Sequence, residues 1–267
     1  MKKEGSDESS ATLWFSDKSN NATEFKDERP VFPEKEAIDD SLRHLFKREK
    51  IRELLRFAAA KGFKYIPLEA TELARVKVGD GEKDLLSIVV EDGGWVGRLE
   101  AIALDQLHIE APEYAERLGK KFRVLLHDLP VTVPVAEIGA DHVGKLIQTH
   151  LRLDRLLTPG VIVEEEHNER IEIQRWLTTP LPSKRIIVEF TGVLASGIYS
   201  KGLEVEVTGI VKLRRKRLTI EVVSERSLVD KFYEAFNFEL KSKRETEAKV
   251  EQKPLRTTVS FLYVKPI

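Results

Sequence analysis

The densest positive charge in the chain lies in six consecutive residues, Lys212–Arg217, with the sequence KLRRKR. Segments 204–211 and 218–223 on either side alternate apolar and polar residues, so this basic run is predicted to form the tip of a β-hairpin. Cations on a protruding ribbon suit phosphate contacts, because each neutralised phosphate releases condensed counterions. The alternative is a solvated turn that protects an edge strand. The residues that we predict to bind nucleic acid here are Lys212, Arg214, Arg215, Lys216 and Arg217.

Other residues are candidates to enlarge this nucleic-acid site. We predict that Lys184 and Arg185 extend the basic patch, and Arg152 with Arg155 form a second candidate pair. Aromatic side chains can stack on bases in barrel proteins that bind single strands. The aromatic candidates, for which a place in the core is the alternative, are Trp176, Phe190 and Tyr199.

A different chemistry is suggested by Gly139–Lys145, which has the G-x-x-x-x-G-K spacing of a phosphate-binding loop. Leu146 stands where Ser or Thr must hold magnesium, and the residues after it are typical of a strand instead of a helix. We therefore expect a turn that leads into a strand, and an NTPase is only the third functional hypothesis.

Metal, redox and hydrolytic sites are not expected. The chain has no cysteine, which excludes disulfides and thiolate zinc sites. Its six histidines show no paired ligand spacing, and the acidic run Glu164–Glu166 is typical of a solvated loop. Asp105 and Asp128 are carboxylates without a partner acid or base in the sequence. We expect no catalytic residue, no bound metal and no cofactor.

The composition limits the kinds of partner. Charged residues make up 33% of the 267, but the net charge is −1, so contact with nucleic acid must come from a local patch. The sequence has no apolar run of about 18–20 residues and no signal-peptide pattern, so we expect a cytoplasmic protein without a membrane partner. The single Met, the absence of Cys and the abundant Glu, Lys and Arg are typical of a thermophilic source.

The N-terminal half is predicted to be a polar tail and a helical subdomain. Residues 1–38 are too polar to form a core and are expected to be a flexible tail. Residues 39–120 have helical apolar spacing from Asp40 or Ser41 to Gly62, and a second helix is expected over Pro112–Gly119. The short apolar segments 63–67 and 85–90 are expected to be strands.

Residues 121–227 have the pattern of a small antiparallel barrel or sandwich, and 228–267 that of a C-terminal helix and tail. The final helix is expected from Leu228 to about Ala248, and a last β-like run over 257–264. The predicted strands of the barrel region are 122–126, 131–135, 145–153, 161–165, 171–177, 185–191, 203–211 and 218–223.

Several motifs in this region resemble the N-terminal domain of archaeal MCM helicases, in the same order along the chain. FRVLLHDLP resembles the segment that leads into the family's barrel, and VAEIGADHVGKLI resembles its region around IGKL. IEIQ is similar to a further strand, and YSKGLEVEVTGI to the strand before its DNA-binding hairpin. These motifs occupy residues 122–130, 135–147, 171–174 and 199–210, with weaker similarity at 101–107 and 115–118.

The resemblance implies an α+β fold: a helical N-terminal subdomain followed by a five-stranded OB-fold barrel with a basic β-hairpin. It makes Arg214–Arg217 the tip that touches DNA. Residues 161–170 form a short acidic link without cysteine, so the zinc subdomain of the family is expected to be absent. The residues after Asp230 are too few for an AAA+ motor, so we expect no ATPase activity. The family also points to an archaeal source.

We therefore predict a non-catalytic protein of DNA replication that binds single- or double-stranded DNA. Its expected partners include an MCM helicase or other replication proteins, and a homo-oligomer is left open. The alternative is an interaction module that docks on a helicase or another replication protein without binding DNA, which the near-zero net charge favours.

Overall fold

Two amphipathic helices open the part of the chain that the computed structural model describes, residues 35–251 except 80, 82, 159, 167–168 and 179–185. Helix α1 (Lys35–Phe46) and helix α2 (Glu49–Lys61) each bury one apolar face. α2 ends at Gly62, whose φ of 77° places it in the left-handed region that caps helices. The single helix predicted from Asp40 or Ser41 is thus two helices. The first begins at Lys35, within the segment predicted to be a tail.

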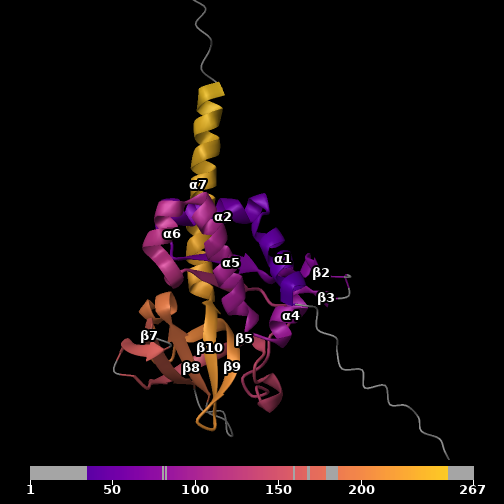
Figure 1. Cartoon of the computed structure of the whole chain (residues 1–267). Coiled ribbons are helices and arrows are strands. Elements are labelled where there is room, and N and C mark those ends of the chain that lie inside the picture. The colour runs from indigo at the N-terminus through magenta and orange to yellow at the C-terminus, as the bar shows by residue number, and fades with distance from the viewer. Residues whose placement is uncertain are drawn as a thin grey trace, which may run out of the picture. The chain divides into compact units, whose positions relative to one another are not determined.

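The chain then forms a parallel pair of strands, and the segment of the sequence between these two strands is largely helical (Figure 1). β1 (Tyr65–Glu69) pairs with β4 (Arg123–His127) over five residues. We predicted the strand at 122–126 as part of the barrel, but its partner is β1 of the helical part. The intervening elements are α3 (Ala70–Ala74), β2 (Lys77–Val78), β3 (Lys83–Asp84), α4 (Leu85–Glu91), α5 (Trp95–Glu110), α6 (Pro112–Leu118) and the 3-10 helix η1 (Gly119–Lys121).

Helix α4 corrects the prediction of a strand over residues 85–90. The Asp84 side chain accepts a hydrogen bond from the Ser87 N–H at 2.8 Å and caps the helix. Its apolar run is buried as a short helix, and a buried helix of this length has the same sequence pattern as a buried strand. The helix predicted over Pro112–Gly119 is confirmed as α6, and α5 was not predicted from the residues.

The second half of the described chain is built on a six-stranded sheet in the order β5-β9-β10-β8-β7-β6. β10 and β8 run parallel, and the other neighbours are antiparallel. β5 also pairs with β7, through three residue pairs. The strands are β5 (Leu146–Leu156), β6 (Ile162–Glu166), β7 (Glu169–Thr178), β8 (Ile187–Thr191), β9 (Glu204–Arg214) and β10 (Arg217–Glu225).

The sheet has six strands, where the sequence predicts a barrel of five. The strand expected over residues 131–135 is a single bridge, from Thr132 to Gln148. Two 3-10 helices, η2 (Ala140–His142) and η3 (Gly192–Ser196), lie in the connections. The β-like run expected at 257–264 falls outside the described residues.

Helix α7 (Arg226–Glu251) follows β10 directly and packs against the helical part. Phe232 of α7 is fully buried, with its ring centroid 5.3 Å from that of Phe57 and 5.0 Å from that of Phe63. Burying one such side chain stabilises the fold by about 1.5–3 kcal/mol. All described elements belong to one compact unit.

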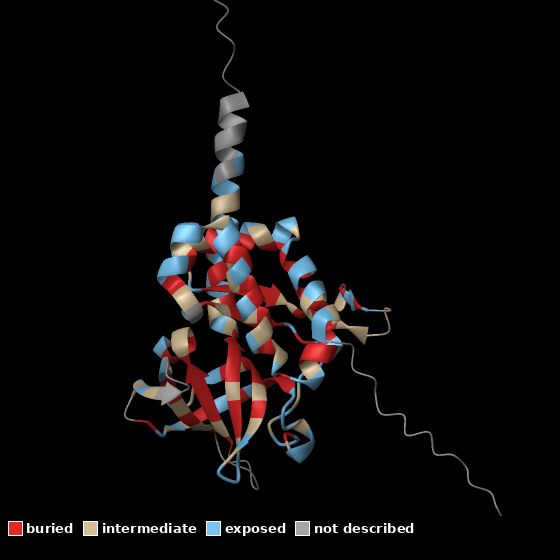
Figure 2. Ribbon diagram, in the orientation of Figure 1, coloured by how far each residue is buried: buried red, intermediate tan, exposed pale blue. Residues whose placement is uncertain are grey.

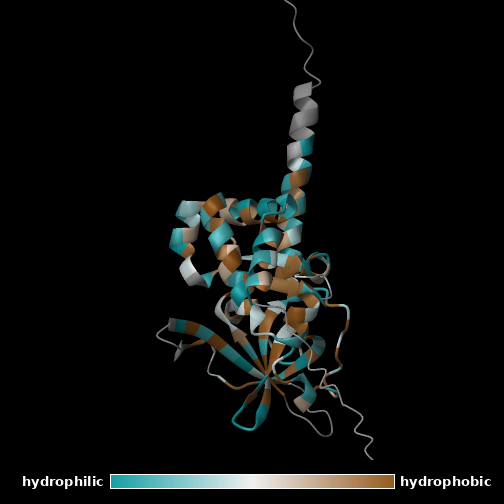
Figure 3. Ribbon diagram, turned by 45° about the vertical axis from the view of Figure 1, so that its right-hand side comes forward, coloured by the Kyte–Doolittle hydropathy of each residue, from teal (hydrophilic) through white to brown (hydrophobic). Residues whose placement is uncertain are grey.

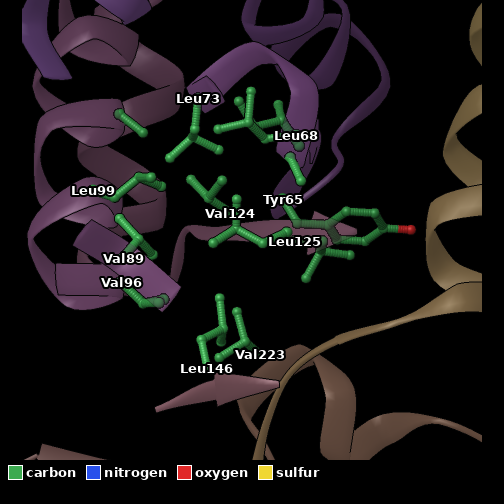
Figure 4. Close-up of a cluster of buried hydrophobic side chains, with 14 of the residues drawn as sticks. Tyr65, Leu68, Leu73, Val89, Val96, Leu99, Val124, Leu125, Leu146 and Val223 are labelled. Carbon is green, nitrogen blue, oxygen red and sulfur yellow. The ribbon is translucent and has the colours of Figure 1, made fainter. Parts of the chain in front are cut away.

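The core is continuous from the helices to the sheet, as the buried residues in Figure 2 show. In Figure 4, Leu146 of β5 and Val223 of β10 lie below Val124 and Leu125 of β4. All four side chains are at most 2% exposed. β4 thus connects the two parts: it pairs with β1 and packs against the sheet that carries the basic hairpin.

Candidate nucleic-acid interface

The basic hairpin predicted from the sequence is formed by β9 and β10. Arg214 pairs with Arg217, which leaves Arg215 and Lys216 as a two-residue turn. Both have positive φ angles, 49° and 64°. A type I′ turn requires this geometry and favours Asn-Gly, since a left-handed conformation costs a larger residue about 1–2 kcal/mol. The two cations are therefore held in a conformation that their side chains disfavour.

Three cations at the tip are open to solvent. Arg215, Lys216 and Arg217 are exposed, and within the described chain none of them forms an ion pair. Figure 3 shows the tip as a hydrophilic end of the hairpin. The neighbouring Leu213 is apolar, yet 61% exposed. These three residues, which we call the cationic tip, concentrate a charge of +3 at the end of the hairpin.

Lys212 and Arg214 were predicted to belong to the same site, but the structure gives them internal partners. The Lys212 ammonium pairs with the Glu221 carboxylate across the hairpin. Arg214 donates to Glu221 at 3.2 Å and lies 3.1 Å from a carboxylate oxygen of Glu189. Their positive charges are therefore balanced within the sheet.

These pairs continue across the sheet as a row of alternating charges. The Glu189 side chain is 2% exposed and accepts from the Arg175 Nε at 2.5 Å. Arg175 also donates both terminal nitrogens to Glu164, at 2.6 and 2.8 Å. The hydrogen bonds from Arg175 lower the pKa of Glu164, and those with Glu164 and Glu189 raise the pKa of Arg175.

We call this row the charge ladder: Glu164, Arg175, Glu189, Arg214, Glu221 and Lys212. The three acids of the ladder balance its three cations, so the ladder has no net charge. The positive charge that this region presents to a ligand therefore comes from the cationic tip. The ladder was not found from the sequence. Its signal was a single acid, Glu189, between the apolar residues Val188 and Phe190 of a strand, which is unfavourable unless the acid is paired.

The other predicted site residues do not gather at the tip. Arg152 faces Glu204 at the start of β9, the end of the strand opposite to Arg214. At about 3.3 Å per residue, this separates it from the tip by roughly 30 Å. Arg155 follows Arg152 on β5, beyond the end of its pairing with β9. Lys184 and Arg185 lie outside the described residues.

The aromatic candidates belong to the core. Trp176 is 4% exposed and Phe190 is fully buried. Tyr199 stacks on Phe190 with 4.1 Å between ring centroids, and its hydroxyl donates to the Leu194 carbonyl at 2.9 Å. None of these three rings is free to stack on a base, so the interpretation as core residues is the one that the structure supports.

The segment Gly139–Lys145 is a 3-10 turn that leads into β5, as the sequence predicted. The N–H of Gly144 donates to the Val211 carbonyl at 2.8 Å, and its carbonyl accepts from the Gly93 N–H at 2.8 Å. These backbone groups tie the turn and the start of α5 to β9. The Gly144 N–H is therefore not directed toward a phosphate.

Asp128, a candidate carboxylate without a partner in the sequence, has two partners in space. It lies 2.8 Å from the Nδ1 of His127 and 2.6 Å from the Nη1 of Arg226. Burial lowers the pKa of His127, and its Nε2 has no hydrogen-bond partner among the described residues. This cluster joins the end of β4 to the start of α7. It lies at the end of β10 opposite to the cationic tip.

No group of three or more His, Asp and Glu side chains in the described part of the chain is arranged to hold a metal ion. Among the described helices, none combines the length and the apolar character needed to cross a membrane.

Comparison with known proteins gives a result at the level of fold. No family model matches the sequence, and no curated protein matches it. A solved structure, the N-terminal domain of an archaeal MCM, superimposes with a TM-score of 0.53 at 12% identity. The match covers 71% of this chain and 98% of that one. The fold is similar to that of an MCM N-terminal domain. At this identity the likeness shows the fold alone, which supports the resemblance inferred from the motifs without showing membership of the family.

Proposed function

We propose that this chain is a non-catalytic DNA-binding protein of replication whose cationic tip contacts the phosphate backbone. The observation that carries this proposal is the tip itself, with three consecutive exposed cations that form no ion pair within the described chain, two of them in a disfavoured backbone conformation. Strain of this kind gathers at functional sites because selection for stability alone would remove it. The fold likeness to an MCM N-terminal domain agrees with this function.

The strand pairings support an OB-type arrangement behind the tip. β5 has neighbours on both sides, β9 and β7, so that five strands follow one another from β5 through β9, β10, β8 and β7 back to β5. We propose that these five strands form the partly open barrel of an OB-fold, with β6 added at its side. Such a barrel is a rigid support that fixes where the hairpin presents its charges.

The binding mechanism that we propose is electrostatic. Three phosphate contacts on a single strand give a slope of about −2 for log K against log salt, since each contact contributes about 0.7. Affinity then falls about 15-fold between 50 and 200 mM salt. Because the ladder charges are paired internally, they add little to this slope. We propose no role for Gly139–Lys145 in nucleotide chemistry and no ATPase activity.

The test is fluorescence anisotropy with labelled DNA at low salt, comparing the wild type with the triple variant Arg215→Ala/Lys216→Ala/Arg217→Ala. We expect the tip variant to lose at least tenfold in affinity. A matched control removes three other exposed cations, Lys47, Lys231 and Lys241, and has the same net charge. Equal binding by the wild type and the tip variant would contradict the proposal.

One observation favours a second function, an interaction module that docks on a replication protein. Among the described strands, β6 lies at the end of the sheet order, and it pairs with β7 alone. Val163 on this strand is 59% exposed, and Val161 next to it 47%. An open strand edge with apolar side chains can pair with a strand of a partner. Absence of DNA binding by the wild type, together with co-purification of a helicase subunit, would favour this function.

A further inference from the structure

An open groove of about 570 Å³ lies beside the hairpin, between β9 and the turn that joins α4 to α5. Its volume falls within the range of small-molecule sites, about 300–1,000 Å³. The groove is lined in part by residues of the ladder, Lys212, Arg214 and Glu221, and by Leu213 between them. It therefore begins one residue away from the cationic tip.

The groove is lined by glycines and apolar side chains as well as by charged ones. Gly97 of α5 and Gly144 line it, and a Cβ atom added at either position would meet nothing within 4 Å. Val143 and Leu213 supply exposed apolar surface, at 41% and 61%. Gly93 has a different role, because its added Cβ would lie 2.8 Å from the Ile210 side chain. That glycine lets the turn approach β9, and the other two leave the space open.

The polar groups at the groove are balanced in charge and mixed in kind. Lys212 and Arg214 present donors, and Asp92 and Glu221 present acceptors. One Asp92 oxygen accepts from the Gly94 N–H at 2.9 Å. Two cations and two acids give no net charge, so the groove does not select an anion. The phosphate-binding charge lies next to it, on the cationic tip.

We infer that the groove accepts an unstacked nucleobase of a single DNA strand whose phosphates contact the cationic tip. A base is a flat, neutral ring with donors and acceptors at its edge, which matches apolar walls with mixed polar groups. Arg214 lines the groove and is bonded to Arg215 of the tip, so the two contacts lie within reach of adjacent parts of one nucleotide. Bases of a duplex are paired and stacked and cannot enter. This inference rests on the proposed function and makes the site selective for single strands.

The test fills the groove without touching the tip. Gly97→Leu places a bulky side chain in the open space and replaces a glycine within a helix by a strong helix former. Ala101→Leu is the control, since it adds the same side chain one turn along α5, at an exposed position that does not line the groove. The probes are a short oligothymidylate, an abasic strand of the same length and a duplex, all followed by fluorescence anisotropy.

We expect the wild type and Ala101→Leu to bind oligothymidylate about tenfold more tightly than the abasic strand, within the range of one base contact. Gly97→Leu should bind the two strands equally while keeping the same salt dependence as the wild type. Undiminished preference for oligothymidylate in Gly97→Leu would overturn the inference and leave the tip proposal intact. Absence of any DNA binding by the wild type would overturn both.

Discussion

At the residue scale, the two turn residues connect stability to function. Arg215 and Lys216 have positive φ angles that Asn and Gly adopt more readily. The double variant Arg215→Asn/Lys216→Gly should therefore raise the free energy of unfolding by about 1–2 kcal/mol. It should also lower DNA affinity, because it removes two of the three cations of the tip. Urea unfolding and anisotropy on the same samples measure both effects.

A matched pair of variants separates the effect of the backbone conformation from the effect of the lost charge. Lys216→Gly alone relieves the backbone at one position and removes one charge, whereas Lys216→Ala removes the same charge without that relief. We expect equal DNA affinities for the two variants and a higher stability for the glycine variant. Equal stabilities would contradict the claim that the turn is strained.

The sequence identified the cations of the hairpin, but it could not divide them into paired and free ones. That division depends on Glu189 and Glu221, which reach Lys212 and Arg214 through the neighbouring strands β8 and β10. Strand order across a sheet is a long-range property that local patterns do not contain. The five cations therefore looked equivalent in the sequence, although in the described part of the chain two of them form ion pairs and the other three do not.

At the scale of elements, the charge ladder fastens four neighbouring strands to one another and to β6. Its central member is Glu189, buried between Arg175 and Arg214. Glu189→Gln leaves both guanidinium groups without this carboxylate, which should lower the free energy of unfolding by about 2–3 kcal/mol. We expect a smaller loss of stability than for a fully buried ion pair, because the side chains of Arg175 and Arg214 are 24% and 36% exposed.

Glu164→Gln is the control for this prediction, because it makes the same chemical change at the exposed end of the ladder. The Glu164 side chain is 41% exposed, and surface pairs contribute about 0–1 kcal/mol. Urea unfolding of both variants gives the comparison. Equal losses in stability would show that burial of Glu189 does not set its contribution.

Elements with a clear period or a terminal signal were predictable, and the helices α4 and α5 were not. Gly62 ended α2 as expected, and alternation located most strands of the sheet. α4 was mistaken for a strand because a short run of Leu, Ile and Val fits either structure. α5 was missed because it carries Gly97 near its start, where glycine weakens a helix pattern.

At the scale of the whole molecule, the cluster of His127, Asp128 and Arg226 links β4 to α7 and should make stability depend on pH. Burial lowers the pKa of His127 below its usual 6.5, so the unfolded chain binds this proton more tightly than the folded one. The contribution of the buried, neutral His127 to the free energy of unfolding is fully present above pH 6.5. It is lost as the pH falls through that value toward the lowered pKa of His127 in the folded chain. The free energy of unfolding changes by about 1.4 kcal/mol for each unit by which the pKa values of His127 in the unfolded and the folded chain differ.

We therefore expect the free energy of unfolding to decrease from pH 7.5 to pH 5.5, as measured by urea titration at both pH values. In His127→Asn, whose amide can still donate to Asp128, the decrease should be smaller. The neighbouring Asp128 has a lowered pKa and titrates in a more acidic range, so it does not contribute to this window. An identical pH dependence in the variant would contradict this role of His127.

The global arrangement could be predicted only in outline. The motif order indicated the fold of an MCM N-terminal domain, and the structural comparison supports that fold. The pairing of β4 with β1 and the six-stranded sheet order could not be derived from the sequence, because each joins segments far apart in the chain. The groove beside the hairpin could not be derived from the sequence for the same reason, since α5 and β9 meet only in the folded chain.

The most direct test of the central claim is the salt dependence of single-stranded DNA binding by the wild type and by the Arg215→Ala/Lys216→Ala/Arg217→Ala variant. We predict a slope of about −2 for the wild type, from three phosphate contacts, and a slope near zero for the variant. The same slope in both proteins would contradict binding through the cationic tip, because the phosphate contacts would then lie elsewhere on the molecule.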